Sequence, residues 1–258
     1  MALQSRPTLR DHIASGGKVL QTDSSTCHLE VPPGQSEDYR LAQLDDYSGL
    51  SRKAFPWRPP LKLSLRTRAS ARSIPGTWGV GLWNDPFGTA LVKGSQMRLP
   101  TLPNAAWFFF ASPPNYLSLR DDLPAHGQLA ATFQSPTKLP AALILALPLL
   151  PLILLPPGGR WLRSQARRYV RQDTAKLDLD PTSWHAYEID WREEVVIFHL
   201  DGQKIFETKV NPEGPLGLVI WIDNQYAGLP PDGRLAYGTL ANKAAAWIEV
   251  EDLKMTFA

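Results

Sequence analysis

The stretch that decides the fold of this chain is WHAYEIDWREEVVIFHLDG, residues 184–202. In its first half the apolar residues Tyr187, Ile189 and Trp191 alternate with more polar ones, which is the period of a half-buried β-strand. A second apolar run, residues 195–200, leads into Asp201-Gly202, a dipeptide typical of a tight hairpin turn. The stretch therefore predicts consecutive antiparallel strands with a tryptophan-rich inner face.

Strand-like segments recur on both sides of this stretch. Residues 61–66 alternate leucines with polar residues, and in residues 77–83 (TWGVGLW) large residues alternate with glycines. Residues 106–111 (AWFFFA) are apolar on both faces, as expected of a central strand buried between two layers. Apolar strands at 216–222 and 246–250, followed by a last strand through Phe257, complete the set. Many short strands separated by Pro and Gly turns predict an all-β fold, a two-sheet antiparallel sandwich.

The central motif is similar to the strand pair of the family 16 glycoside hydrolases, the laminarinase and β-glucanase jelly rolls of the concanavalin A type. The matching positions are Trp184, His185, Tyr187, Ile189, Trp191, Phe198, Leu200, Asp201 and Gly202. Weaker matches at 76–83 and 248–257 extend the resemblance over roughly residues 60–258, apart from an insertion near 139–171. The alternative is that any antiparallel hairpin with a Trp-rich core gives a similar pattern. The resemblance implies a jelly roll with a ligand cleft, and a structural role for His185.

The catalytic residues of that family are missing from this chain. The family needs a Glu-x-Asp-x-Glu strand, whose two glutamates lie about 5 Å apart in a retaining mechanism. No glutamate occurs between Glu37 and Glu188, and the adjacent Asp121 and Asp122 would point to opposite faces of a strand. Residues 107–110 are expected at the catalytic position, with aromatic side chains in place of carboxylates. Retaining glycosidase activity is therefore not expected, and a cleft remade for an apolar ligand is favoured.

The sequence predicts a ligand site on the strands at 77–83, 106–111 and 216–222. Apolar walls from the tryptophans, a few polar anchors and the space beside Gly79 and Gly81 would suit a small molecule. The candidate ligand-binding residues are Trp83, Trp107, Trp221, Asp223, Asn224 and Tyr226. Core packing of the same tryptophans is the competing interpretation. Asp85, His185 and Asp223 are weak acid/base candidates, which would require them to converge on one pocket.

Composition limits the remaining chemistries. The charges nearly balance, with 27 Lys and Arg against 25 Asp and Glu, which argues against a nucleic-acid binder. A single cysteine, Cys27, excludes an internal disulfide framework. The five histidines are scattered, so no metal site is predicted, and no phosphate or dinucleotide motif indicates a cofactor. The first 25 residues lack an apolar run typical of a signal peptide, so a cytoplasmic location is expected.

The apolar insertion LPAALILALPLLPLILLPP, residues 139–157, contains only Leu, Ile, Ala and Pro. A straight helix of this length would reach about 28 Å, but a single membrane span would separate strands that belong to one sandwich. Pro148 and Pro151 would also remove helical hydrogen bonds that lipid cannot replace. We expect a bent loop that either dips into one leaflet or lies over an apolar cleft. The predicted lipid contacts are Leu143, Leu147, Leu150 and Leu154.

A basic helix is predicted directly after this insertion. Gly158-Gly159 is expected to act as a hinge into residues 160–172, RWLRSQARRYVRQ, with an apolar stripe and a cationic face. Such a helix suits an anionic membrane surface, with Arg163, Arg167 and Arg168 as further contacts. The alternatives are a self-buried lid packed on the sandwich and a surface for a protein partner.

The sequence therefore predicts a polar N-terminal arm, residues 1–40, and a single jelly-roll domain, residues 41–258, interrupted by the loop and helix at 139–172. The expected function is a peripheral, monotopic membrane-associated protein that binds a small apolar or lipid-linked ligand in a remodelled glucanase-like cleft. The alternative is an enzyme acting on such a ligand, either a degenerate glycosidase or an isomerase or cyclase. A structural subunit of a membrane complex is a third possibility.

Overall fold

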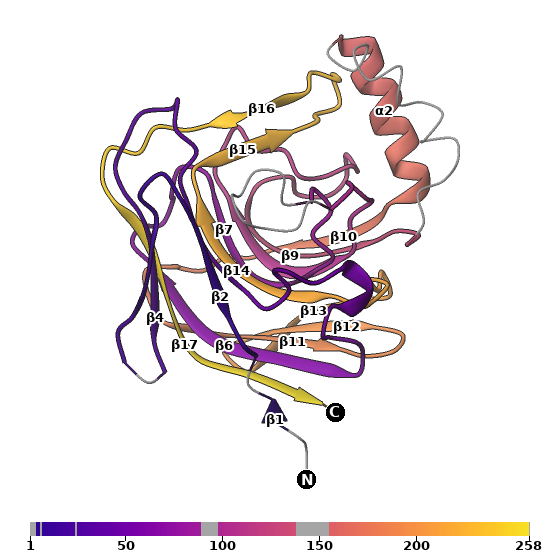
Figure 1. The fold of residues 1–258 in the computed structure, drawn as a ribbon. Coiled ribbons are helices and arrows are strands. Elements are labelled where there is room, and N and C mark those ends of the chain that lie inside the picture. Colours follow the sequence, from indigo (N-terminus) through magenta and orange to yellow (C-terminus); the bar gives the residue numbers. More distant parts are fainter. Residues whose placement is uncertain (1–3, 6, 24, 89–97, 138–154, 258) are drawn as a thin grey trace.

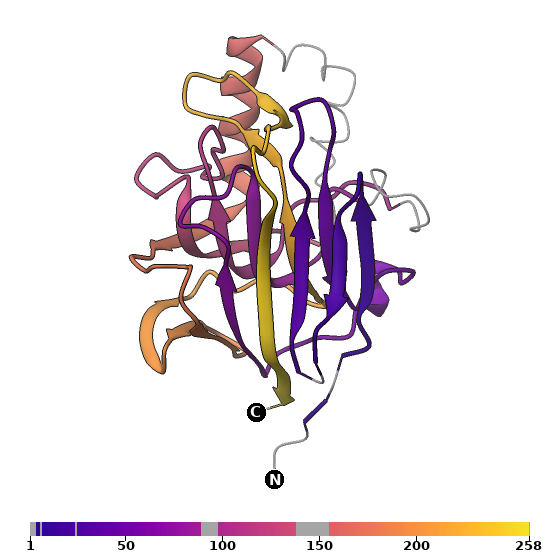
Figure 2. The same cartoon turned by 90° about the vertical axis from the view of Figure 1, so that its left-hand side faces the viewer.

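Two antiparallel sheets pack face to face in the computed structural model, which describes residues 4–5, 7–23, 25–88, 98–137 and 155–257 (Figures 1 and 2). The outer sheet has eight strands, in the order β13 (Gln203–Thr208), β12 (Val196–Leu200), β11 (His185–Trp191), β6 (Leu61–Ala69), β17 (Ala246–Phe257), β4 (Cys27–Val31) and β3 (Lys18–Gln21), with β1 (Gln4–Ser5) paired to β17. The second sheet has seven, in the order β10 (Arg171–Lys176), β9 (Gly127–Gln134), β8 (Ala105–Ala111), β7 (Thr77–Trp83), β14 (Gly217–Asp223), β5 (Leu41–Asp45) and β2 (Arg10–Ala14). The predicted two-sheet jelly-roll sandwich is confirmed.

Three smaller elements complete the fold. A short hairpin of β15 (Gln225–Gly228) and β16 (Ala236–Thr239) extends the end of β14, and helix α2 (Pro156–Tyr169) precedes β10. A 3-10 turn, η1 (Arg52–Ala54), lies between β5 and β6. The hairpin and α2 stand at the same end of the molecule, with the chain termini at the opposite end (Figure 1).

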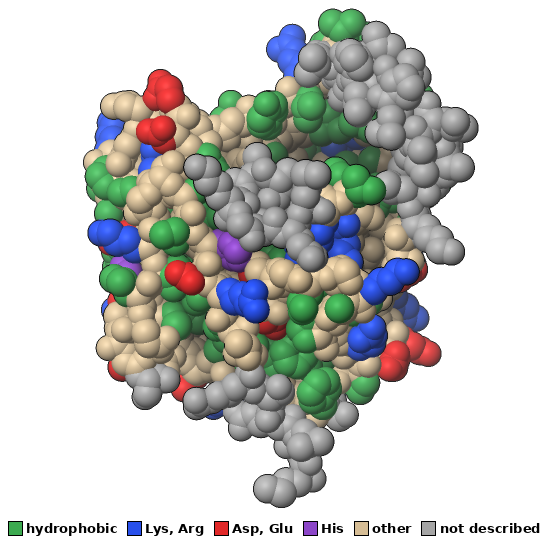
Figure 3. All heavy atoms as spheres, viewed as in Figure 1, with side chains coloured by type: hydrophobic (Ala, Val, Ile, Leu, Met, Phe, Trp, Pro, Cys, Tyr) green, Lys and Arg blue, Asp and Glu red, His purple; other side chains and the backbone are tan. Residues whose placement is uncertain are grey.

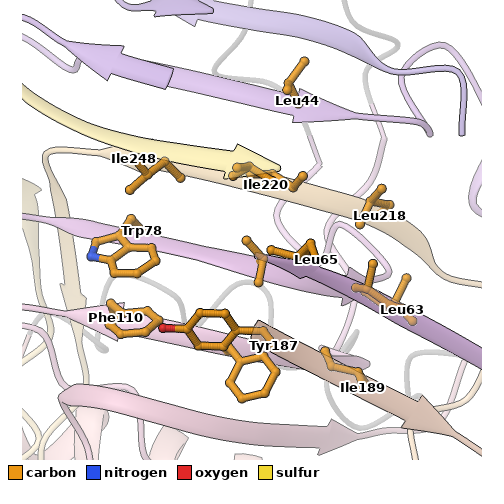
Figure 4. Close-up of a cluster of buried hydrophobic side chains, with 14 of the residues drawn as sticks. Leu44, Leu63, Leu65, Trp78, Phe110, Tyr187, Ile189, Leu218, Ile220 and Ile248 are labelled. Atoms are coloured by element: carbon orange, nitrogen blue, oxygen red, sulfur yellow. The ribbon is translucent and has the colours of Figure 1, made fainter. Parts of the chain in front are cut away.

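The core lies between the two sheets and follows from the alternation in the sequence. Leu63 and Leu65 of β6 lie opposite Ile189 and Tyr187 of β11, and all four side chains are buried (Figure 4). From the second sheet, Trp78 of β7 stacks on its cross-strand neighbour in β8, Phe110, with ring centroids 3.6 Å apart. Burial of such large aromatic and aliphatic side chains is the main stabilising contribution to a sandwich of this kind.

His185 and Asp201, near the two ends of the central motif, join the start of β11 to the turn between β12 and β13. The ring nitrogen Nδ1 of His185 lies 2.7 Å from Asp201 Oδ2, and the amide of Ala186 donates to Asp201 Oδ1. Asp201 and Gly202 both have positive φ, 51° and 78°, as a tight hairpin turn requires. The structural role expected for His185 is thus accounted for by its contacts on the outer sheet.

The N-terminal arm expected over residues 1–40 is corrected by the structure. Strand β2 is an edge strand of the second sheet, and β3 and β4 extend the outer sheet, so this region belongs to the sandwich. Leu29 and Val31 of β4 are buried in the core, and Val19 and Cys27 pack against it, while the other side chains of these strands are exposed or half-buried. Because edge strands of this kind carry polar residues, their sequence resembles that of a loop.

The basic helix also begins earlier than predicted. Helix α2 starts at Pro156 and runs through Gly158 and Gly159, so these glycines are not a hinge. Gly159 packs against the backbone of Gly233, where an added Cβ would lie 1.8 Å from the carbonyl oxygen. No helix among the described residues is long and apolar enough to cross a bilayer. The predicted lipid contacts Leu143, Leu147, Leu150 and Leu154 lie outside the described residues.

Candidate functional site

A cleft of about 520 Å³ lies over the seven-stranded sheet, on the face turned away from the core. Its floor consists of side chains that alternate with the core residues of β8, β9 and β14. These floor residues are Trp107, Phe109, Phe133, Val219 and Trp221. Hydrophobic side chains gather around the hollow between the β15–β16 hairpin and α2 (Figure 3). The volume falls within the range of small-molecule sites.

The aromatic floor is a continuous set of ring contacts. Trp107 is central, with ring centroids 5.7 Å from Trp221, 5.9 Å from Phe133 and 5.9 Å from Trp83. Phe109 lies 5.1 Å from Trp221. Interplanar angles between 44° and 74° are typical of favourable tilted and edge-on aromatic pairs. The side chains of the floor therefore pack against one another and also line the cleft.

The structure corrects the role predicted for Gly79 and Gly81. A Cβ on Gly79 would lie 2.5 Å from Cη2 of Trp221, and a Cβ on Gly81 would lie 2.4 Å from Cβ of Trp107. The glycines therefore make room for the floor tryptophans rather than for a ligand. The predicted free space beside them is filled by these indoles, which lie across β7.

One wall of the cleft is the apolar stripe of α2. Leu162 and Ala166 face the cleft, and Val170 continues the stripe directly after the helix. Leucines from two loops, Leu117 and Leu229, face the same space. The apolar face predicted for this helix thus packs over the cleft. This is the arrangement expected of a self-buried lid, the alternative to membrane contact.

Arg163 fastens α2 to the sandwich. Its guanidinium donates to the carbonyl oxygens of Ser118 at 2.7 Å and Leu229 at 2.6 Å, and to Asp121 Oδ1 at 2.7 Å. Its side chain is only 4% exposed. The hydrogen bond from Arg163 is the main reason that the pKa of Asp121 is lowered. Arg163 is therefore not available for lipid contact, which corrects its predicted role.

The other two arginines predicted to contact lipid lie on the outer side of α2. Arg167 pairs with Asp121 Oδ2 at 2.9 Å, and its side chain is partly exposed. Arg168 is exposed and contacts only Gln165, at 3.4 Å, among the side chains that the structure describes. Asp121 thus serves as the partner of two arginines, in a loop and not in the strand position that catalysis would require.

The polar end of the cleft is built around Asp223, the last residue of β14. Asp223 Oδ1 accepts hydrogen bonds from Thr77 Oγ1 at 2.7 Å and from the amide of Gln225 at 3.1 Å. Thr77 Oγ1 in turn accepts from the indole nitrogen of Trp221 at 2.9 Å. Burial raises the pKa of Asp223 to about 7, against the lowering effect of its hydrogen-bond donors. The hydroxyl of Tyr39 lies beside this carboxyl, and burial together with Asp223 raises the pKa of Tyr39.

The acid/base candidates do not converge on the cleft. Asp85 is buried in an ion pair with Arg98 at 2.7 Å, and burial raises its pKa despite this partner. His185 lies on the outer sheet. Of the three candidates, only Asp223 faces the space lined by Trp83, Trp107 and Trp221. The arrangement therefore lacks the predicted trio.

Two predicted ligand contacts are placed away from the cleft lining. The amide side chain of Asn224 is fully buried, where it accepts from the amide of Arg40 and donates to the carbonyl oxygens of Asp38 and Leu240. Tyr226 packs against Gly238 of the paired strand. Sequence reasoning missed Tyr39, Gln43 and Thr77, which do line the cleft. Alternation within residues 77–83 could have indicated Thr77, which shares a face with Gly79, Gly81 and Trp83.

Comparison with solved structures supports the fold. No protein-family model matches the chain, and no curated protein matches it. The laminarinase catalytic domain from Thermotoga maritima is similar in structure, with a TM-score of 0.51 and 10% identity, over 97% of this chain and 91% of that one. The β-glucanase of Bacillus licheniformis gives a TM-score of 0.49 and 10% identity, over 100% and 98% of the two chains. The chain therefore has the fold of the laminarinase-like jelly rolls, as its central motif predicted.

Proposed function

We propose that this chain binds a largely apolar ligand in the cleft. The observation that carries the proposal is the lining: an aromatic floor and a leucine-rich wall enclose a space of ligand size, with polar groups in the minority. The T. maritima domain of the same fold has been solved in complex with cetyltrimethylammonium bromide, a long-chain amphiphile. An apolar or lipid-linked ligand is the class that such a lining would bind.

The cleft does not favour glucan hydrolysis. A retaining mechanism needs two carboxyl groups about 5 Å apart. On β8 the residues of the cleft face are Ala105, Trp107, Phe109 and Ala111, and Asp223 is the only acidic side chain among the described residues that line the cleft. A glucanase-like fold is thus combined with a cleft lining that lacks the two carboxyl groups of a retaining mechanism.

Blocking the cleft is expected to abolish ligand binding. Ala166 faces the cleft from α2, so Ala166→Phe would place a ring in the ligand space, whereas Ser164 is exposed on the same helix. With the neutral dye N-phenyl-1-naphthylamine as the probe, we expect Ala166→Phe to weaken binding about tenfold or more, as loss of ~1.4 kcal/mol of apolar contact would. Fluorescence titration measures the affinity, with Ser164→Phe as the matched control. Equal binding by both variants and the wild type would place the dye elsewhere.

We further propose that the outer side of α2 rests on an anionic membrane surface, from which an apolar ligand would enter. Leu155 and Trp161, next to and within α2, are 58% and 43% exposed, and Arg160 and Arg168 are exposed beside them. Phe87, which lines the cleft, is 69% exposed. Exposed apolar side chains beside arginines suit the interface of an anionic leaflet.

Vesicle flotation tests this second proposal. Wild type is expected to float with phosphatidylglycerol vesicles and to float less in high salt, because salt screens the arginines. Leu155→Ser with Trp161→Ser should lower the floating fraction several-fold. The matched control is Ile13→Ser with Leu20→Ser, two residues exposed to a similar extent on β2 and β3. Wild type that stays with the soluble fraction at low salt, or equal losses in the two double variants, would contradict the membrane contact.

A further inference from the structure

The cleft has a polar end and an apolar end, and this division indicates the class of ligand. Asp223 and Thr77 mark the polar end, where they face each other across β14 and β7. At the other end of the same strand pair Gly217 lies opposite Trp83. The two ends of β14 are six steps of the chain apart, about 20 Å at the rise of an extended strand. An elongated ligand with a polar head and an apolar body would fit this division.

Asp223 is a buried carboxyl without a cationic partner. The hydroxyl of Thr77 and the amide of Gln225 donate to its Oδ1, and the hydroxyl of Tyr39 lies beside the carboxyl, so these neighbours are all neutral. By contrast, Asp85 and Asp121 are each paired with an arginine. No ion pair within the described ranges of the chain includes Asp223. A buried carboxylate needs a compensating positive charge. A cationic ligand would supply this charge to Asp223.

Gln43 adds an acceptor further along the cleft, since the residue of β5 that lies opposite Asp223 is Leu41. It lies opposite Trp221 in the register of β5 and β14 and also lines the cleft. Its Nε2 donates to Asp45 Oδ2 at 2.9 Å and lies 3.3 Å from the hydroxyl oxygen of Tyr47. The carboxylate of Asp45 fixes the amide in this orientation, so Oε1 remains as the acceptor, and no side chain among the described residues donates to it. The cleft thus offers the acceptors of Asp223 and Gln43 beside the hydroxyls of Thr77 and Tyr39.

We propose that the cleft selects amphiphiles whose head group is a protonated amine, with the ammonium seated against Asp223 and the apolar body lying over Trp107 and Trp221. The proposal rests on the proposed function, since it names the ligand class of the same cleft. The ring faces of the floor also favour a cation, because they carry the negative part of the aromatic quadrupole. A charge-assisted hydrogen bond from the ammonium would compensate the buried charge.

The proposal makes affinity depend on pH in a defined direction. With a pKa of about 7, Asp223 is mostly protonated and neutral at pH 5.5 and mostly ionised at pH 8.5. An alkylamine keeps its proton at both values, so its affinity should rise with pH as the carboxylate forms. If only the ionised form binds the amine, the increase is about 30-fold. An uncharged head group should show little change.

Three probes with the same twelve-carbon chain test the head group: dodecylamine, 1-dodecanol and dodecanoate. Each would displace N-phenyl-1-naphthylamine from the wild-type protein, in competition titrations at pH 5.5 and 8.5. We expect dodecylamine to bind at least tenfold more tightly than dodecanol at pH 8.5, and dodecanoate more weakly than dodecanol. The preference for the amine should shrink at pH 5.5.

Asp223→Asn provides the matched variant, because asparagine keeps an oxygen to accept from Thr77 and Gln225. It should lose the preference for dodecylamine and its pH dependence, while its affinity for dodecanol stays within about twofold. Asp122→Asn, which removes one exposed charge outside the cleft lining, should behave as wild type. Folding of each variant is checked by circular dichroism.

The outcomes separate the two proposals. If the three probes bind wild type equally, or if Asp223→Asn keeps the preference for the amine, the head-group proposal is overturned and the apolar site stands. If neither the dye nor any probe binds, the proposed function itself fails. A preference for the amine that disappears only in Asp223→Asn supports both.

Discussion

Replacing Arg163 with methionine is expected to detach α2 from the cleft and to lower the free energy of unfolding by about 3 kcal/mol. The buried guanidinium donates to the carbonyl oxygens of Ser118 and Leu229 and pairs with Asp121. Methionine has a similar length but no donor, so both carbonyl oxygens would lose a charged hydrogen-bond partner. Because Leu162 and Ala166 form a wall of the ligand space, affinity for the neutral dye should also fall.

Arg168→Met is the control for this prediction. Arg168 is exposed on the same helix and contacts Gln165 at 3.4 Å, so its replacement should change the free energy of unfolding by less than about 0.5 kcal/mol. Urea unfolding followed by far-ultraviolet circular dichroism measures both variants. Equal stability and equal dye binding in the two variants would mean that Arg163 does not fasten the helix.

Asp223→Asn is expected to stabilise the protein increasingly as the pH rises. The carboxyl has a pKa of about 7 in the folded protein, against an ordinary value of 3.8. Between these values the folded state holds a proton that the unfolded state has lost, so the contribution of Asp223 to stability is full below pH 4. It is lost as the pH rises to 7, by about 4 kcal/mol in all. Asparagine does not titrate, so the variant does not lose this contribution to the free energy of unfolding.

Unfolding by urea at pH 4.5, 6 and 8 tests this prediction. The difference between the variant and wild type, relative to its value at low pH, should grow from about 1 kcal/mol at pH 4.5 to about 4 kcal/mol at pH 8. Burial also raises the pKa of Asp46, to about 6, and this carboxyl would reduce stability over part of the same range. It is present in both proteins, so the difference between them isolates Asp223. Parallel pH profiles would show that Asp223 is not held protonated by the fold.

The fold could be predicted to the extent that each strand has one clear inner face. Period-two alternation identified β6, β7 and β11, because Leu, Trp and Tyr side chains mark the core side. Strands β2 and β3 escaped prediction, since edge strands with mostly exposed side chains have no such contrast. The register of neighbouring strands is likewise absent from the sequence.

The site could be predicted in part for the same reason. Trp221 and Asp223 follow from alternation on β14, and Trp107 follows from the resemblance, which places residues 107–110 at the catalytic position of the family. The contact of Gly79 with Trp221 depends on strand register, and the contact of Arg163 with Asp121 depends on how a loop approaches α2. Local patterns carry no information about either contact.

Titration calorimetry with 1-dodecanol and with a laminarin oligosaccharide tests the central claim most directly. We expect dodecanol to bind wild type at one site with a negative heat-capacity change, the mark of apolar burial, and to bind Ala166→Phe much more weakly. No heat of binding is expected from the oligosaccharide. One-site binding of the oligosaccharide, with no binding of dodecanol, would contradict the account and show that the cleft still recognises glucan.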